Sequence, residues 1–109
     1  PKLGKVGDYD YIYACHNLLF PVVREFAPDL IIVSSGFDSA LNDPLGGIGV
    51  TPFGYAWMTY GLQQIQPKMM VVLEGGYNLK SIAVSAEAII QQLLIDPGKQ
   101  AQVDAYLAQ

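Results

Sequence analysis

Cysteine and histidine are both scarce in this sequence, which has one of each among 109 residues. A single cysteine excludes an internal disulfide framework, and the single histidine offers no Ser-His-Asp or Cys-His catalytic arrangement. Charged residues make up only 15% of the chain, and the net charge of −4 leaves no basic face that would attract nucleic acid. No apolar run reaches the roughly 20 residues that a membrane-spanning helix requires.

Apolar residues, by contrast, make up 51% of the chain. A domain of this length exposes a large share of its surface and usually carries more charge. We therefore expect some apolar faces to pack against a further part of the same protein or against another subunit. The chain opens at Pro1, with neither an initiator methionine nor a signal-peptide pattern, and we expect it to be cut from a longer polypeptide.

Proline and aspartate delimit the first helical segment. Asp8 is predicted to cap a helix that begins near residue 9. Pro21 is predicted to kink or restart that helix, because proline is tolerated in a first turn but not in a helix interior. The segment is expected to end before Pro28, since the residue preceding a proline resists the helical conformation.

Two strands and two further helices follow. Residues 30–33 and 69–73 are short, wholly apolar runs, typical of strands covered on both faces. Helical spacing predicts a helix that starts at a Thr51 cap, ends at Pro67 and is buried on most sides. The last helix is predicted to start at an Asn78 cap and to carry an apolar stripe. The stripe comprises Ile82, Ala86, Ile89, Ile90, Leu93 and Leu94, and Pro97-Gly98 ends the helix.

This order of elements predicts an α/β fold. Two buried strands joined by a helix form a parallel, right-handed βαβ unit. Ligands of open α/β sheets bind beyond the carboxyl ends of the strands. The long loop of residues 34–50 and the short loop of residues 74–78 both leave such ends, so we expect them to meet at one edge of the sheet and to form the functional site.

Each loop offers candidate functional groups. Asp38 follows the first strand and could ligate a divalent metal such as zinc, cap a helix or brace the loop. Asp43 precedes a proline, which favours a turn, and is predicted to brace the loop. The Gly75-Gly76-Tyr77 run could place a tyrosine hydroxyl at an oxyanion, cradle a phosphate, or simply form a tight turn.

Two other reactive side chains are predicted to be structural. His16 lies in the first helical segment beside apolar neighbours, far in sequence from both loops. Cys15 has no nearby partner that would activate a nucleophile. Neither residue is therefore a candidate for catalysis.

The two loops together resemble the hallmark segments of one enzyme family. Residues 30–47 read LIIVSSGFDSALNDPLGG, which is similar to the V-S-A-G-F-D-A-A-x-G-D-P-L-G-G pattern of class II histone deacetylases. Residues 71–79, VVLEGGYNL, match the second hallmark loop, and residues 50–55 resemble the helix start between the two. The resemblance covers residues 4–97, nearly the whole chain.

The departures from the family pattern are small. Ser35 and Ser39 replace alanines, and Asn42 replaces a glycine, which is expected to tilt the loop slightly. Tyr77 stands where the weakly active branch of class II has histidine, and Leu45 stands where the polyamine-preferring branch has glutamate. The chain therefore resembles the active, lysine-directed branch.

The resemblance implies a fold, an activity and a location. The fold is the parallel-sheet, three-layer arginase/deacetylase fold, of which residues 1–97 are the C-terminal part of the catalytic domain. Residues 98–109 are a C-terminal extension, expected to form a short helix. The implied activity is zinc-dependent hydrolysis of acetyl-lysine in histones or other proteins, in the nucleus, the cytoplasm or both.

The resemblance also assigns roles to individual residues. Asp38 would be one of three zinc ligands, and Tyr77 would be the catalytic tyrosine. Leu45 would line the acyl-lysine channel, and Gly75 and Gly76 would shape the pocket beside the tyrosine. The family's other zinc ligands, an Asp-x-His segment, and its tandem histidines lie upstream and are absent here, so the chain alone is expected to be inactive and to bind zinc poorly.

Three other interpretations stay open. A close relative could hydrolyse acetylpolyamines or another small amide with the same metal chemistry. A non-catalytic α/β domain could bind a partner protein instead. A nucleotide-binding domain built on Gly75-Gly76 is the weakest of the three, because the chain lacks both a Walker lysine and a G-x-G-x-x-G turn.

Overall fold

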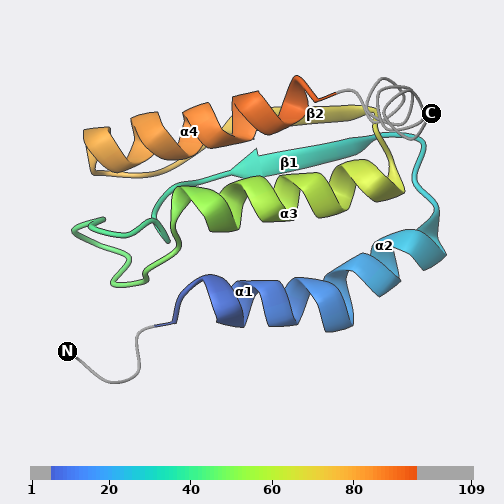
Figure 1. Cartoon of the computed structure of the whole chain (residues 1–109), viewed down its shortest axis with the longest axis horizontal. Helices are drawn as coiled ribbons and strands as arrows, with labels where there is room; N and C mark the ends of the chain where they lie inside the picture. The colour runs from blue at the N-terminus through green and yellow to red at the C-terminus, as the bar shows by residue number, and fades with distance from the viewer. Residues whose placement is uncertain (1–5, 96–109) are drawn as a thin grey trace, which may run out of the picture.

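The computed structural model describes residues 6–95, in which helices pack on one face of a two-stranded parallel sheet (Figure 1). The predicted order of helix, strand, helix, strand and helix is confirmed. The elements are α1 (Asp8–Ala14), the π-helical segment η1 (Cys15–Leu19), α2 (Phe20–Phe26), β1 (Ile31–Ser35), α3 (Pro52–Ile65), β2 (Met69–Leu73) and α4 (Leu79–Leu93).

The prediction that Asp8 caps the first helix is wrong. Gly7 is the N-cap, and its N–H donates to the Asp10 carboxylate at 2.9 Å. Asp8 lies inside α1, where its carboxylate accepts hydrogen bonds from both the backbone N–H and the hydroxyl of Thr51. The aspartate is therefore engaged at the start of α3, a partner distant in sequence, rather than at the start of its own helix.

A π-helical turn precedes Pro21 in the first helical segment. The Phe20 N–H donates to the Cys15 carbonyl, five residues back, and α2 then restarts with Pro21 in its first turn. This confirms the predicted restart at Pro21. The helix ends at Phe26, before Pro28 as predicted, where Ala27 takes a left-handed conformation with φ of 51°.

The strands β1 and β2 pair in parallel, from Ile31 opposite Met69 to Ser35 opposite Leu73. The connecting helix α3 begins after Thr51 as predicted, with proline in its first turn, and ends at Ile65, two residues before the predicted stop at Pro67. Both strands therefore send their carboxyl ends to the same edge of the sheet, where the two loops emerge.

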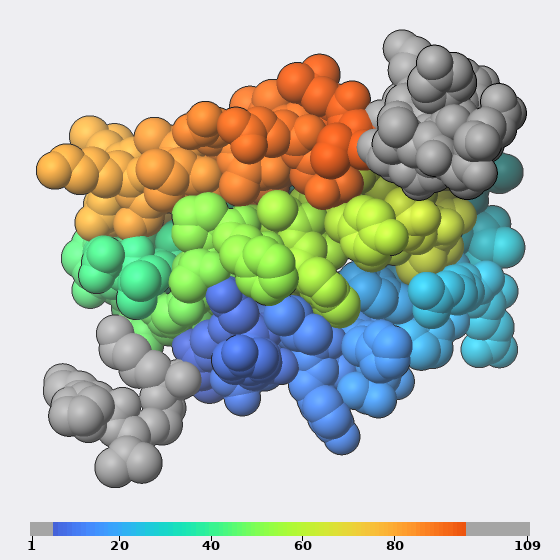
Figure 2. All heavy atoms as spheres, in the orientation of Figure 1, coloured from blue at the N-terminus to red at the C-terminus, as the bar shows by residue number. Residues whose placement is uncertain are grey.

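Within residues 6–95 only one of the two strand faces predicted to be covered is covered. Side chains of Ile31, Val33 and Val71 on one face are half-buried, whereas Ile32 and Met70 on the other face are 60% and 49% exposed. The helices α3 and α4 pack against each other, and Figure 2 shows α3 between α4 and α1. Helix α3 is buried on most sides as predicted, and Phe53 and Tyr60 are its only exposed apolar side chains.

The core lies at the carboxyl end of the sheet and includes the long loop. Phe37, Ala40 and Val50 from this loop are buried with Tyr55 of α3 and Ile89 of α4. The Phe37 and Tyr55 rings meet edge to face, with centroids 5.1 Å apart. The loop is therefore anchored by its own apolar side chains and holds a fixed position above the sheet.

The predicted Asn78 cap is confirmed, because its side chain accepts from the backbone N–H groups of Lys80 and Ser81 at 3.1 and 3.0 Å. The predicted stripe on α4 is partly buried: Ile89 is in the core, whereas Ile90 and Leu94 are exposed. The predicted helix end at Pro97-Gly98, the boundary at residue 97 and the terminal helix within residues 98–109 lie outside the described residues. Among the described residues, no helix is both long and apolar enough to cross a membrane.

Candidate functional site

Backbone hydrogen bonds join the two loops directly beyond the strands. The Glu74 N–H donates to the Ser35 carbonyl at 3.1 Å, and the Phe37 N–H donates to the Gly75 carbonyl at 2.8 Å. These bonds extend the pairing of β1 and β2 into the loops. They place Asp38 and Gly75 on the same edge of the sheet, as the sequence predicts.

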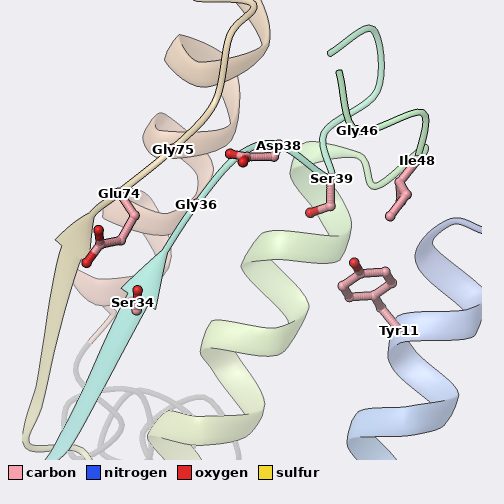
Figure 3. A pocket seen from close by; sticks show the side chains of 9 residues that line it. All are labelled: Tyr11, Ser34, Gly36, Asp38, Ser39, Gly46, Ile48, Glu74 and Gly75. Atoms are coloured by element: carbon pink, nitrogen blue, oxygen red, sulfur yellow. The ribbon is translucent and has the colours of Figure 1, made fainter. Parts of the chain in front are cut away.

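An open pocket of about 420 Å³ lies at this edge. Figure 3 shows Asp38 beside Gly75, with the Tyr11 ring of α1 directed toward Ser39. Four parts of the chain, namely α1, β1 and the two loops, thus contribute to one cavity. Its lining residues are Tyr11, Ser34, Gly36, Asp38, Ser39, Gly46, Ile48, Glu74 and Gly75.

Glycines leave the space that the Asp38 residue occupies. A β-carbon at Gly75 would collide with Asp38 Oδ1 and lie 2.8 Å from Oδ2. A β-carbon at Gly46 would overlap the Asp38 carbonyl oxygen, whereas one at Gly36 would lie 3.4 Å from Oδ1, an ordinary contact. A side chain at Gly46 would therefore require the main chain of Asp38 to move, and one at Gly75 would require its carboxylate to move.

The Asp38 carboxylate is free to bind an external group. It is exposed, and no hydrogen bond from residues 6–95 reaches it. A carboxylate in this setting suits zinc as one oxygen ligand. The described residues contain no cluster of three or more His, Cys, Asp or Glu side chains that could hold a metal ion.

Asp43 braces both loops, which confirms the bracing role predicted from its sequence. Its Oδ1 accepts from the backbone N–H groups of Leu45 and Gly46, and its Oδ2 accepts from that of Tyr77, all at 2.8 Å. Burial raises the pKa of this carboxyl, but the three hydrogen bonds outweigh burial and hold the pKa below its ordinary value. The bracing is therefore lost only when the pH falls through this lowered pKa.

The pocket lining does not include Leu45, Gly76 or Tyr77, although all three are within two residues of the lining residues Gly46 and Gly75. The side chains of Tyr77 and Leu45 are 58% and 72% exposed. Gly76 has a φ of 126°, and a β-carbon there would approach Phe37 and Ile82 closely, so glycine is required at this turn. The structure thus brings Asp38 and Gly75 into one cavity. The Tyr77 ring, which lies in the same loop as Gly75, is exposed.

Asn42 adopts a left-handed conformation with φ of 72°. Asparagine tolerates this region better than most residues, and the family pattern has glycine at this position. The backbone therefore takes a conformation suited to glycine.

A buried tyrosine, Tyr55, contacts the pocket residue Ser39. The Tyr55 hydroxyl lies 2.7 Å from the Ser39 hydroxyl, one of the departures from the family pattern. Burial is the main cause of a raised pKa for Tyr55, so its phenol stays neutral at ordinary pH. Ser39 thus lines the cavity on one side and pairs with the core on the other.

The two side chains predicted to be structural lie outside the pocket. Cys15 is buried in η1, and burial raises the pKa of its thiol, which makes it a poor nucleophile. His16 is exposed on the same segment. Sequence reasoning did not nominate the lining residues Tyr11, Ser39 and Glu74, although each lies inside or beside a segment that resembles the family.

Comparison with known proteins decides the family. The sequence profile of the histone deacetylase domain matches residues 1–93.

The chain belongs to the histone deacetylase family.

It is 52% identical over 104 residues to histone deacetylase 5 of Arabidopsis thaliana, a match that covers 94% of this chain and 16% of the relative. It is also 45% identical over 93 residues to the human polyamine deacetylase HDAC10, covering 84% of this chain and 14% of the relative.

Solved structures show the same fold. The crystal structure of the HDA15 HD domain superposes with a TM-score of 0.83 at 51% identity, covering 85% of this chain and 27% of that chain. The described α/β arrangement is therefore a part of the histone deacetylase fold, which confirms the fold class predicted from the sequence. The chain spans about a sixth of the length of the curated relatives.

Proposed function

We propose that this chain forms part of a deacetylase domain that hydrolyses the acetyl-lysine amide of histones or other proteins with the help of zinc. The observation that carries the proposal is the exposed Asp38 carboxylate, which lies beside Gly36 and Gly75 at the edge where both loops meet. Family membership and the Gly75-Gly76-Tyr77 loop support it. The nucleus, the cytoplasm or both are the compartments in which we propose that the protein acts.

In this proposal Asp38 would contribute one oxygen ligand to zinc, and the other ligands would come from outside this chain. Bound zinc would supply Lewis-acid polarisation of the acetyl carbonyl. Leu45 would contact the alkyl chain of the acyl-lysine, and Gly75 and Gly76 would keep the space beside the carbonyl free.

The role proposed for Tyr77 is to donate a hydrogen bond during the reaction. Water adds to the amide carbonyl carbon, the C–N bond breaks, and acetate and the lysine amine leave. The Tyr77 hydroxyl would donate to the carbonyl oxygen as it gains negative charge, and the phenol does so without adding a formal charge. Its 58% exposure leaves the side chain accessible to a substrate.

This proposal can be tested in a chimaeric domain in which residues 6–95 replace the matching segment of the HDA15 deacetylase domain. We call it the complete domain. Tyr77→Phe is expected to lower kcat on an acetyl-lysine peptide by about 10²–10³, because one oxyanion donor is lost. Tyr13→Phe, which changes an exposed tyrosine of α1 outside the pocket, is the matched control.

Unchanged activity of the Tyr77→Phe domain would refute the proposed role of this residue. Asp38→Asn is expected to lower the zinc content measured by metal analysis, and retention of full zinc content would refute the ligand assignment. The isolated chain serves as the negative control, because one carboxylate coordinates zinc too weakly to sustain catalysis.

Hydrolysis of acetylpolyamines is a second candidate, favoured by the 45% identity to the human polyamine deacetylase. Leu45 speaks against it, because an apolar side chain gives a cationic polyamine no charged partner. Kinetics of the complete domain on acetyl-lysine peptides and acetylated polyamines separate the two. Absence of activity on both substrates would favour a non-catalytic, partner-binding domain.

A further inference from the structure

One buried carboxylate connects the two loops that form the proposed active site. Asp43 is only 8% exposed, and its two oxygens accept three backbone N–H groups. Oδ1 fixes the turn of its own loop through Leu45 and Gly46, while Oδ2 reaches across to Tyr77. Each oxygen therefore holds a different loop.

The loop of Tyr77 needs an external acceptor to fix its main chain. Gly75 and Gly76 precede the tyrosine, and glycine allows more backbone conformations than any other residue. Within residues 6–95, the Asp43 carboxylate is the acceptor for the Tyr77 N–H. The Gly75 carbonyl is held by the Phe37 N–H, so removal of the Asp43 acceptor would leave the Tyr77 N–H unpaired and Gly76 free to reorient.

Besides the backbone bonds at Glu74 and Gly75, two side-chain bonds link the long loop to the start of α4. The Asn78 side chain donates to the Asn42 carbonyl at 3.0 Å, and the Ser81 hydroxyl donates to the Leu41 carbonyl at 2.7 Å. Both bonds are exposed and hold the start of α4. They keep the two loops together when Asp43 is changed, but they do not reach the main chain of Tyr77.

We propose that Asp43 is a positioning residue that fixes the main chain of Tyr77 relative to that of Leu45 and so holds the tyrosine at the substrate carbonyl. This inference rests on the function proposed above for Tyr77. Asp43 is buried and both of its oxygens accept backbone N–H groups, so it acts through these hydrogen bonds and not through contact with metal or substrate.

The geometry of the carboxylate suggests a selective substitution. Asparagine has the shape of aspartate but only one acceptor oxygen, and its second terminal atom is an NH2 donor. When the amide oxygen accepts from the Leu45 and Gly46 N–H groups, the NH2 group lies against the Tyr77 N–H. Both of these groups are donors, so no hydrogen bond forms between them. Asp43→Asn should thus release Tyr77 while it leaves the Leu45 turn in place.

We expect Asp43→Asn to lower kcat of the complete domain by about ten-fold, less than the loss of the phenol itself, with KM and zinc content nearly unchanged. Asp43→Ala removes both sets of bonds and should raise KM as well. Asp29→Asn removes the same charge from an exposed position and is the matched control. A full kcat in the Asp43→Asn domain would overturn the proposal.

A double-mutant cycle distinguishes positioning from general stabilisation. If Asp43 acts through Tyr77, Asp43→Asn should cause little further loss of kcat in a Tyr77→Phe background. Losses that multiply would show that Asp43 acts independently of the tyrosine and would refute the positioning role. If Asp43→Asn does not fold, Asp43→Glu takes its place in the cycle with the same two outcomes, because its extra methylene moves the two oxygens away from the positions at which they meet the Leu45 and Tyr77 N–H groups.

Failure of the proposed function gives a different result. If Tyr77→Phe alone leaves kcat unchanged, the catalytic assignment of Tyr77 fails whatever Asp43 does. If Tyr77→Phe lowers kcat and Asp43→Asn does not, only the inference about Asp43 fails.

Discussion

Gly75 shows how a residue without a side chain can define a site. A β-carbon at this position would collide with the Asp38 carboxylate, which comes from the neighbouring loop. The glycine is therefore required by a tertiary contact as well as by its own backbone. Residues 71–79 identify the glycine pair through family resemblance, but the sequence alone does not reveal which atom fills the space.

Substitution of Gly75 by alanine should displace the Asp38 carboxylate and weaken metal binding. In the complete domain we expect Gly75→Ala to lower zinc affinity by about 10–100-fold, the loss typical when a residue that orients a metal ligand is changed. Gly36→Ala is the matched control, because its β-carbon would make only an ordinary contact with Asp38 Oδ1. Equal zinc affinities for the two variants in a chelator competition assay would contradict the packing argument.

Two aspartates mark the limit of local sequence reasoning. The bracing role of Asp43 could be predicted because aspartate before proline favours a turn. Its bond to the Tyr77 N–H could not, since that partner belongs to another loop. Asp8 has the pattern of a helix cap, yet its carboxylate binds Thr51 at the start of α3. In both cases a long-range partner determines what the side chain does.

At the scale of elements, the bounds of β2 and the start of α3 match the prediction, because prolines and N-cap residues mark them locally. The burial of faces was harder to predict. An apolar run such as residues 69–73 has the same composition whether one face of a strand is covered or two. The pattern predicted cover on both faces, whereas Ile32 and Met70 are exposed in the described part of the chain.

The packing of α2 against α3 depends on Gly61. A β-carbon there would collide with the ring of Phe20, which is 3% exposed and packs on Trp57 with ring centroids 5.5 Å apart. Gly61→Ala should cost about 1–3 kcal/mol through overpacking, partly offset by about 1 kcal/mol of gained helix propensity. The melting temperature of the complete domain should therefore fall.

A second substitution checks the cause of this loss. Phe20→Leu in the Gly61→Ala background removes ring atoms that collide with the new methyl group, so the double variant should recover part of the lost stability. A melting temperature that falls further, by the sum of the two single effects, would contradict the collision.

At the scale of the whole molecule, the described chain carries an apolar sheet face that no element within residues 6–95 covers. Ile32, Met70 and Val72 are 60%, 49% and 39% exposed on this face, and two strands alone form a marginally stable sheet. The composition predicted such a face, since half of the chain is apolar. We propose that the remainder of the deacetylase domain covers it, because this chain spans only 27% of the solved HDA15 chain.

The uncovered face should make the isolated chain self-associate, and threonine substitutions should reduce this. Ile32→Thr with Val72→Thr keeps β-branched side chains and hence strand propensity, but it replaces apolar surface with hydroxyls. Tyr9→Ser with Phe26→Ser is the control, because these side chains are 89% and 80% exposed on α1 and α2, away from the sheet.

In sedimentation velocity, the sheet-face pair should shift the chain toward the monomer and the control pair should not. A monomeric unmodified chain, or an equal shift for both pairs, would show that this face does not drive association. In the complete domain the same sheet-face pair should instead lower the melting temperature, because there the two side chains would be buried against the rest of the domain.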